Sequence, residues 1–143
     1  MIYLRDSKIK IQSASEIAKL LRDLLLREDE VDQAKEHLYV IHLDIRSRVN
    51  MVELVTLGTL SSSLVHSRET FRRAIMQASA SIIVGHNHTS GEVDPSDENL
   101  KVTKALFEAG KLLGIDLLDH IIFSRNAFFS FRENKIMQMK KRR

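Results

Sequence analysis

The 143-residue sequence contains no cysteine, and this absence excludes disulfide bonds and thiolate chemistry. A metal ion bound by this chain must therefore be held by imidazole, carboxylate, amide or water. The sequence also lacks any run of about 18 apolar residues, so we expect no membrane-spanning segment. Its first residues, MIYLRDSKIKIQ, have no apolar core of the kind found in export signals, and we expect a cytoplasmic location.

The sequence also has no large excess of positive or negative charge, and its formal net charge is only +3. Much of this excess lies in the basic C-terminal tail, residues 136–143, which ends in KKRR. A short basic end is usually a solvated terminus, and no aromatic residues alternate with the basic ones as they do in single-strand binders. DNA is therefore a weakly supported partner. The length fits one domain over residues 1–143.

Three stretches have the hydrophobic spacing of helices. Residues 13–28 begin with a capping-box pattern formed by Ser13 and Glu16. Residues 67–80 repeat apolar side chains at helical intervals, and residues 96–113 form the third predicted helix.

The boundaries of the third helix are marked by local signals. The only proline, Pro95, holds Asp94 in an extended conformation. Ser96 then suits the N-cap, and Gly114 suits the left-handed position that ends a helix.

Short apolar stretches between the helices are predicted strands, and they cover residues 36–44, 51–60, 81–85, 115–124 and 126–131. The first two should form a hairpin around the polar loop 44–50. A strand, a helix and a strand in residues 81–124 indicate a crossover between parallel strands. We therefore predict an α/β fold, with a mixed sheet flanked by helices.

The segment GHNHTSGEVDPSDEN, residues 85–99, is the strongest candidate for a site. His86 and His88 are two of only six histidines, and residues i and i+2 of an extended chain point to the same side. They follow a buried strand and precede a helix start, where free N–H groups favour an oxygen or an anion. Two imidazoles, an oxygen ligand and a water describe an open zinc site. The alternative is that both rings only form hydrogen bonds with carbonyl groups of the loop.

These residues resemble the metal-binding motif of the JAMM (JAB/MPN) metalloproteases, which runs His, any residue, His, seven residues, Ser, two residues, Asp. His86, His88 and Ser96 lie at the corresponding spacings. The blocks HNHTSG, PSDENLKVTKAL, LGIDLLDHIIF, VTLGTLSSSLVHSRETF and EHLYVIHLD are similar to the RadC-like branch over roughly residues 14–131. The resemblance implies a cytidine-deaminase-like fold and zinc-dependent peptidase or isopeptidase chemistry on a peptide or protein substrate.

The resemblance also implies roles for single residues. His86 and His88 would hold zinc, and Ser96 would bond the reacting carbonyl as well as cap the helix. Glu36 is the best match to the general base, and Glu53 is its competitor.

Two further residues, Asp119 and His120 in the block LLDHIIF, have two open interpretations. They could orient the metal ligands by hydrogen-bonding to them without contacting the metal. Alternatively, they could pack and hydrogen-bond at the edge of the core.

The sequence departs from the motif at its last position, where Asn99 replaces the aspartate. An amide oxygen can ligate a metal but carries no charge, so we expect weaker zinc binding. The leading hypothesis is a zinc metallo-hydrolase with His86, His88 and Asn99 as ligands. The alternative is a catalytically degenerate JAMM domain that binds a protein partner or DNA, since RadC proteins have carried a DNA-repair label.

Overall fold

The computed structural model describes residues 2–5, 9–59, 61, 63 and 65–136. Its central feature is a six-stranded sheet with the strand order β1-β3-β2-β4-β5-β6. The strands are β1 (Ile2–Arg5), β2 (His37–Leu43), β3 (Val49–Leu57), β4 (Ser81–Asn87), β5 (Asp116–Phe123) and β6 (Phe128–Ser130). The helices are α1 (Ala14–Leu25), α2 (Glu30–Gln33), α3 (Ser67–Met76) and α4 (Asp97–Leu113).

The sheet is mixed, as the sequence predicts. β4 and β5 run parallel and are connected by α4, whereas the other neighbouring pairs are antiparallel. The hairpin of β2 and β3 extends the same sheet, with β2 paired to β4. The predicted α/β class and the predicted crossover are therefore both confirmed.

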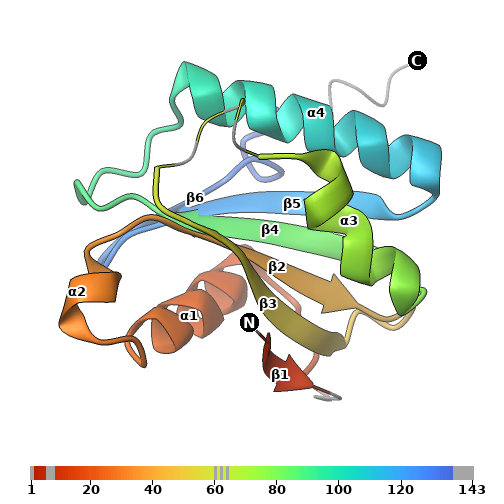
Figure 1. Ribbon diagram of the computed structural model, residues 1–143, viewed down its shortest axis with the longest axis horizontal. Coiled ribbons are helices and arrows are strands. Elements are labelled where there is room, and N and C mark those ends of the chain that lie inside the picture. The colour runs from red at the N-terminus through yellow and green to blue at the C-terminus, as the bar shows by residue number, and fades with distance from the viewer. Residues whose placement is uncertain (1, 6–8, 60, 62, 64, 137–143) are drawn as a thin grey trace.

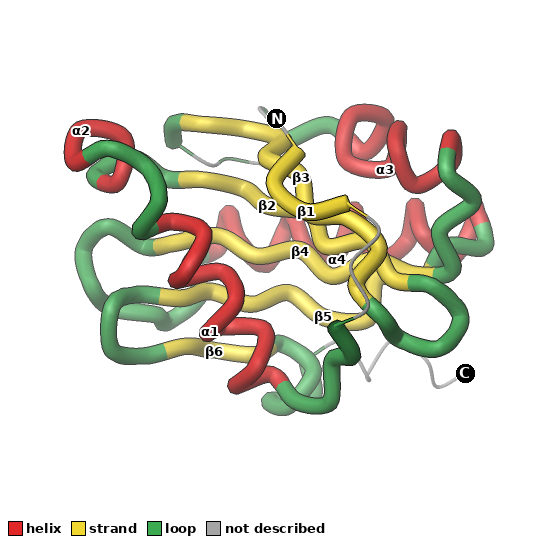
Figure 2. The backbone as a smooth tube through the Cα atoms, turned by 90° about the horizontal axis from the view of Figure 1, so that it is seen from below, coloured by secondary structure: helices red, strands yellow, loops and turns green. Residues whose placement is uncertain are grey.

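Helices cover both faces of the sheet. α3 and α4 lie on one face, and α1 lies on the opposite face (Figure 1). Seen from below, α1 crosses the sheet obliquely in front of the strands (Figure 2). All residues of β2 and β4 are buried, because these central strands have helices on both sides.

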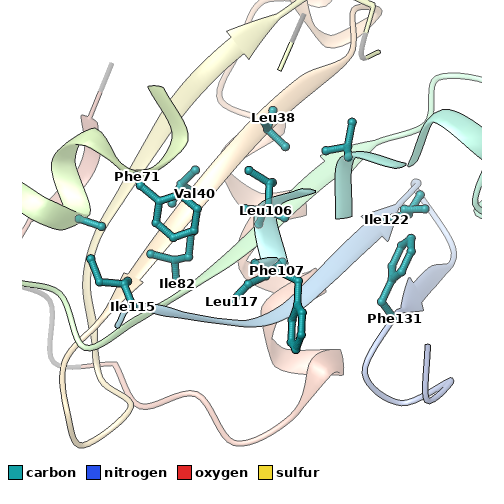
Figure 3. Packing of buried hydrophobic residues seen from close by; sticks show 13 residues of the cluster. Leu38, Val40, Phe71, Ile82, Leu106, Phe107, Ile115, Leu117, Ile122 and Phe131 are labelled. Carbon is teal, nitrogen blue, oxygen red and sulfur yellow. The ribbon is translucent and has the colours of Figure 1, made fainter. Parts of the chain in front are cut away.

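Two apolar clusters fill the space between the layers. Side chains of α3 and α4, such as Phe71 and Leu106, pack on Leu38, Val40 and Ile82 of the sheet (Figure 3). Alternate residues of the same strands point the other way and pack against α1. Because successive side chains of a strand point to opposite faces of the sheet, one apolar strand contributes to both clusters.

The predicted helix signals are found in the structure. Ser13 caps α1 by accepting from the backbone N–H of Glu16 at 3.2 Å, while the Glu16 carboxylate accepts from Gln12 N at 2.7 Å. Ser96 caps α4, and Gly114 ends it in the left-handed region with φ 73°. Helix α3 ends at Met76, four residues before the predicted end.

Two short elements were not predicted. β1 pairs with the outer edge of β3, and α2 is one turn capped by Asp29. Elements of four residues are too short to show a hydrophobic period. The basic tail was predicted over residues 136–143, and residues 137–143 lie outside the described ranges.

Two glycines allow close approach of neighbouring backbone or side chains. A side chain at Gly85, in β4, would overlap the Cδ1 atom of Leu21 on α1. A Cβ at Gly110, in α4, would lie 2.5 Å from the carbonyl oxygen of Ile115. The contact at Gly110 is with backbone and therefore limits what this position of α4 can hold, whereas the contact at Gly85 is with a side-chain end that can shift.

Within the described ranges, none of the helices combines the length and the apolar content that crossing a bilayer requires.

The Gly110 contact gives a test of the packing. We expect Gly110→Ala to lower the free energy of unfolding by about 1–3 kcal/mol, because the new methyl group meets backbone that cannot rotate away. The gain in helix propensity, about 1 kcal/mol, does not offset this overlap. Urea unfolding measures the change. Glu108→Ala, at an exposed position of the same helix, is the control and should stay within about 0.5 kcal/mol. A Gly110→Ala protein as stable as the control would contradict the described contact.

Candidate metal centre

His86 and His88 lie side by side at the end of β4. The sequence places both after the strand, whereas the structure extends β4 to Asn87 and includes His86. The ring centroids of the two histidines are 4.8 Å apart, with the rings inclined at 63°. His88 is anchored by its backbone N–H, which donates to Phe123 O at 3.0 Å. The structure thus brings the two rings together, as the i, i+2 spacing predicts.

The ring of His88 lies between two acceptors. Its Nδ1 is 2.9 Å from the carbonyl oxygen of Glu92, so Nδ1 carries a hydrogen and donates. Its Nε2 is 3.1 Å from Oδ1 of Asn99. That atom is identified as the oxygen because it accepts from the N–H of Ser96 at 2.9 Å. An electron pair of Nε2 therefore faces one of Oδ1, and a metal ion bound by both atoms would remove the repulsion between them.

The spacing of these two atoms suits a shared metal ion. Zinc–nitrogen and zinc–oxygen bonds of about 2.1 Å at a tetrahedral angle put two ligand atoms about 3.4 Å apart. The observed 3.1 Å between His88 Nε2 and Asn99 Oδ1 is close to that value.

His86 supplies a second available nitrogen. It is fully buried, and its Nε2 has no hydrogen-bond partner within the described part of the chain. Burial, and then the neighbouring His120 and His88, hold the pKa of His86 well below its usual value. The ring is therefore neutral, which is the form that binds metals. A buried nitrogen without a partner costs free energy, so this atom fits a ligand position.

His120 supports the ring of His86 directly, and Thr103 supports it through His120. Its Nδ1 is 2.8 Å from Nε2 of His120, and Nδ1 of His120 is 2.5 Å from Oγ1 of Thr103. The ring of His120 also stacks on Phe131, with centroids 4.6 Å apart. Burial lowers the pKa of His120 to about 3. Sequence reasoning left the role of His120 open and missed Thr103.

Asp119 has a different environment from His120. Its carboxylate accepts from the Ser130 hydroxyl at 2.6 Å and from the N–H groups of Arg132 and His120 at 3.0 and 2.7 Å. Burial raises the pKa of Asp119, and these hydrogen bonds oppose the rise. The side chain therefore fastens the turn after β6 to β5 and does not reach the histidine pair.

Ser96 and Asn99 form a reciprocal capping box at the start of α4. Ser96 Oγ accepts from Asn99 N at 3.1 Å, and Asn99 Oδ1 accepts from Ser96 N at 2.9 Å. Accepting leaves the hydroxyl hydrogen of Ser96 to donate, and its side chain is exposed. Asn99 is buried, at 3% exposure, and has two functions, since it caps the helix and faces His88.

The two candidate glutamates lie in different surroundings. Glu53 accepts from Nε of Arg73 at 3.0 Å and faces Nε2 of His42 at 2.8 Å. It is 5% exposed and belongs to a structural network on β3. The ladder between β2 and β4 ends at the pair of Leu38 and His86, and Glu36 lies two residues before Leu38 as His88 lies two residues after His86. Glu36 is half-buried. Glu53 is thus held in a separate network with His42 and Arg73, whereas Glu36 directly precedes the strand that pairs with β4.

The residues present fit a divalent metal, although the ligand set has no anion. His86 Nε2, His88 Nε2 and Asn99 Oδ1 offer two nitrogens and one neutral oxygen. No cluster of three or more His, Cys, Asp or Glu residues suited to a metal occurs in the part of the chain that the structure describes. Any metal bound here would depend on the amide oxygen and on water for its remaining ligands.

A cavity of about 710 Å³ opens beside His88, between β4, β5 and the ends of α1 and α2. Its size is within the range of small-molecule and peptide pockets. Its wall combines apolar and polar side chains, among them Leu25, Gln33, Asn87, Thr89, Phe123 and Arg125. Of the three candidate metal ligands, only His88 is among the residues that line this cavity.

Comparison with known proteins gives a family match over most of the chain. The family model described as the RadC-like JAB domain matches residues 11–136. The resemblance seen over roughly residues 14–131 is thus confirmed and reaches slightly further at both ends.

Individual relatives agree with this match. The chain is 40% identical over 132 residues to the UPF0758 protein of Chlorobium phaeovibrioides and 41% identical over 135 residues to that of Pelodictyon phaeoclathratiforme. It is 41% identical over 132 residues to the UPF0758 protein of Methanococcoides burtonii. These alignments cover 92%, 94% and 92% of this chain, but only 57%, 59% and 56% of the relatives. Their names state no metal, substrate or reaction.

The Glu53 network gives a stability test that separates it from the candidate site. We expect Glu53→Gln to lower the free energy of unfolding by about 1–3 kcal/mol, because the buried His42 and the partly buried Arg73 lose a charged acceptor. Glu69→Gln is the matched control, since Glu69 also pairs with an arginine but in an exposed position, 58% exposed. We expect it to change stability by less than about 0.5 kcal/mol in urea unfolding. Equal effects of the two substitutions would contradict a structural role for Glu53.

Proposed function

Because the chain belongs to the RadC-like JAB domain family, we propose that it is a zinc-dependent hydrolase of the JAMM type, acting on a peptide or isopeptide bond. The observation that carries the proposal is the unpartnered Nε2 of His86 beside the facing pair of His88 Nε2 and Asn99 Oδ1. The chain spans less than three fifths of the length of these relatives, and the proposal concerns this domain.

The residues at the site would divide the chemistry among them. His86, His88 and Asn99 would hold the ion. When bound, zinc would polarise the scissile carbonyl and lower the pKa of a water molecule to about 7. Glu36 would accept the proton of the attacking water and pass it to the leaving nitrogen.

The start of α4 would stabilise the developing negative charge. The hydroxyl of Ser96 can donate to the carbonyl oxygen while its lone pair still accepts from Asn99 N. The N-terminus of α4 adds a partial positive charge on the same side. The capping box thereby holds Ser96 in one orientation, which reduces the reorganisation needed during reaction.

Metal analysis with Glu36→Gln tests the proposal. We expect protein purified without chelator to contain zinc and to cleave a peptide or a ubiquitin-like fusion. Glu36→Gln should keep the zinc and lower kcat by about 10²–10⁴-fold, the usual contribution of a general base. His88→Ala should lose both metal and cleavage. Glu69→Gln is the control for loss of one carboxylate. Absence of both zinc and cleavage in the unaltered protein would refute the hydrolase.

A second candidate function is a degenerate JAMM domain that binds a protein partner or DNA without catalysis. The neutral Asn99 favours it, because two imidazoles and an amide give a dication no anionic ligand. Asn99 Oδ1 also accepts from Ser96 N, which weakens it as a donor to a metal.

Asn99→Asp distinguishes the two candidates. Aspartate can keep the capping bond and adds a charge at the helix N-terminus, so we expect a folded protein that binds zinc at least about 10-fold more tightly. Asn126→Asp adds the same charge in an exposed turn and should leave zinc binding unchanged. If zinc binding and hydrolysis appear only in Asn99→Asp, the natural domain is not an enzyme. If the protein binds DNA and removal of residues 140–143 abolishes that binding, DNA binding is a property of the tail.

A further inference from the structure

A chain of hydrogen bonds connects the first turn of α4 to the buried ring of His86. Oγ1 of Thr103 donates to the carbonyl oxygen of Asn99 at 2.7 Å, and Oγ1 also lies 2.5 Å from Nδ1 of His120. Nε2 of His120 lies 2.8 Å from Nδ1 of His86. We refer to Thr103, His120 and His86 as the imidazole relay. All three side chains are buried, so water does not compete for these bonds.

The chemistry of the groups gives the relay a direction. A hydroxyl has one hydrogen, and that of Thr103 is used on the Asn99 carbonyl, which can only accept. Thr103 Oγ1 must then accept from Nδ1–H of His120. A neutral imidazole has one N–H, so Nε2 of His120 accepts from Nδ1–H of His86. The remaining nitrogen of His86, Nε2, is left with a lone pair and no hydrogen.

The opposite direction is less favourable. In that arrangement Thr103 would donate to His120, His120 would donate to His86, and Nε2 of His86 would carry the hydrogen. The bond to the Asn99 carbonyl would be lost, leaving two relay bonds in place of three. It would also bury an N–H without an acceptor at His86 Nε2, and orphaned buried N–H groups are rare.

We propose that Thr103 and His120 are positioning residues, which set the tautomer of His86 so that its Nε2 lone pair is directed at the metal position. The proposal rests on the proposed function in that the metal is the intended recipient of this lone pair. The stacking of His120 on Phe131, with ring planes 7° apart, keeps the relay in one orientation. The relay starts at the backbone of Asn99, so it also couples two candidate ligands, one on α4 and one on β4.

Nitrogen-15 NMR of the imidazole rings tests the tautomer in metal-free protein. We expect His86 to carry its hydrogen on Nδ1 and to show an unprotonated Nε2. In Thr103→Val the acceptor for His120 is removed, so His120 can reverse and a hydrogen should appear on Nε2 of His86. Thr103→Ser keeps the hydroxyl and should restore the original signature.

Zinc titration by calorimetry supplies the second readout, with zinc alone as the ligand. We expect Thr103→Val to weaken zinc binding by about 10–100-fold, the usual effect of losing a partner of a ligating histidine. Thr103→Ser should recover most of the affinity.

Thr70→Val is the matched control for this titration. Thr70 is also fully buried, and its hydroxyl donates four residues back to His66 O at 3.2 Å, but it belongs to α3 and does not contact the relay. This variant should bind zinc as the unaltered protein does.

Two results would overturn the relay. One is a hydrogen on Nε2 of His86 in the unaltered metal-free protein. The other is equal zinc affinity of Thr103→Val and Thr70→Val. Failure of the unaltered protein to bind zinc would instead refute the proposed function, and the nitrogen spectra of metal-free protein would still decide the direction of the relay.

Discussion

Burial of β4 on both faces is the constraint on which the rest of this structure depends. Every residue of the strand is buried, and the strand ends in polar residues. A buried polar group without a partner is costly, so each of these side chains has to be satisfied from within the protein. The side chain of Asn87 is satisfied by hydrogen bonds to the backbone of His37 and Lys35. In His86, only Nδ1 has a partner, which is His120. The other ring nitrogen, Nε2, has no hydrogen-bond partner in the described part of the chain, and it is the atom available to bind a metal.

The first turn of α4 shows how one residue can serve both folding and chemistry. Asn99 closes the capping box with Ser96, and the same oxygen faces His88. An aspartate at this position could cap the helix and face His88 with a full negative charge. Asparagine does the same with the dipole of a neutral amide. Helix formation is therefore secured with either residue, and the difference falls almost entirely on the affinity for a cation.

The parts of the molecule that sequence predicts best are those set by local interactions. The caps Ser13, Ser96 and Gly114 depend on residues within four positions of each other, and all three are found. The adjacency of His86 and His88 follows from strand geometry alone. The partners of His86 and Glu53 could not be predicted, because they depend on how β5 and α3 are placed against strands distant in the sequence. His120 carried a partial signal, as a histidine within a strongly apolar strand, whereas Thr103 resembled an ordinary helix residue.

The close fit of Leu21 against Gly85 constrains any attempt to redesign this region. The bare backbone at Gly85 lies between Val84 and His86, and α1 occupies the space that a side chain there would need. A side chain added at position 85 would therefore have to displace the flexible end of the Leu21 side chain, on the face of the sheet opposite to α4. Relatives with a larger residue at position 85 should therefore have a smaller or repositioned side chain at position 21.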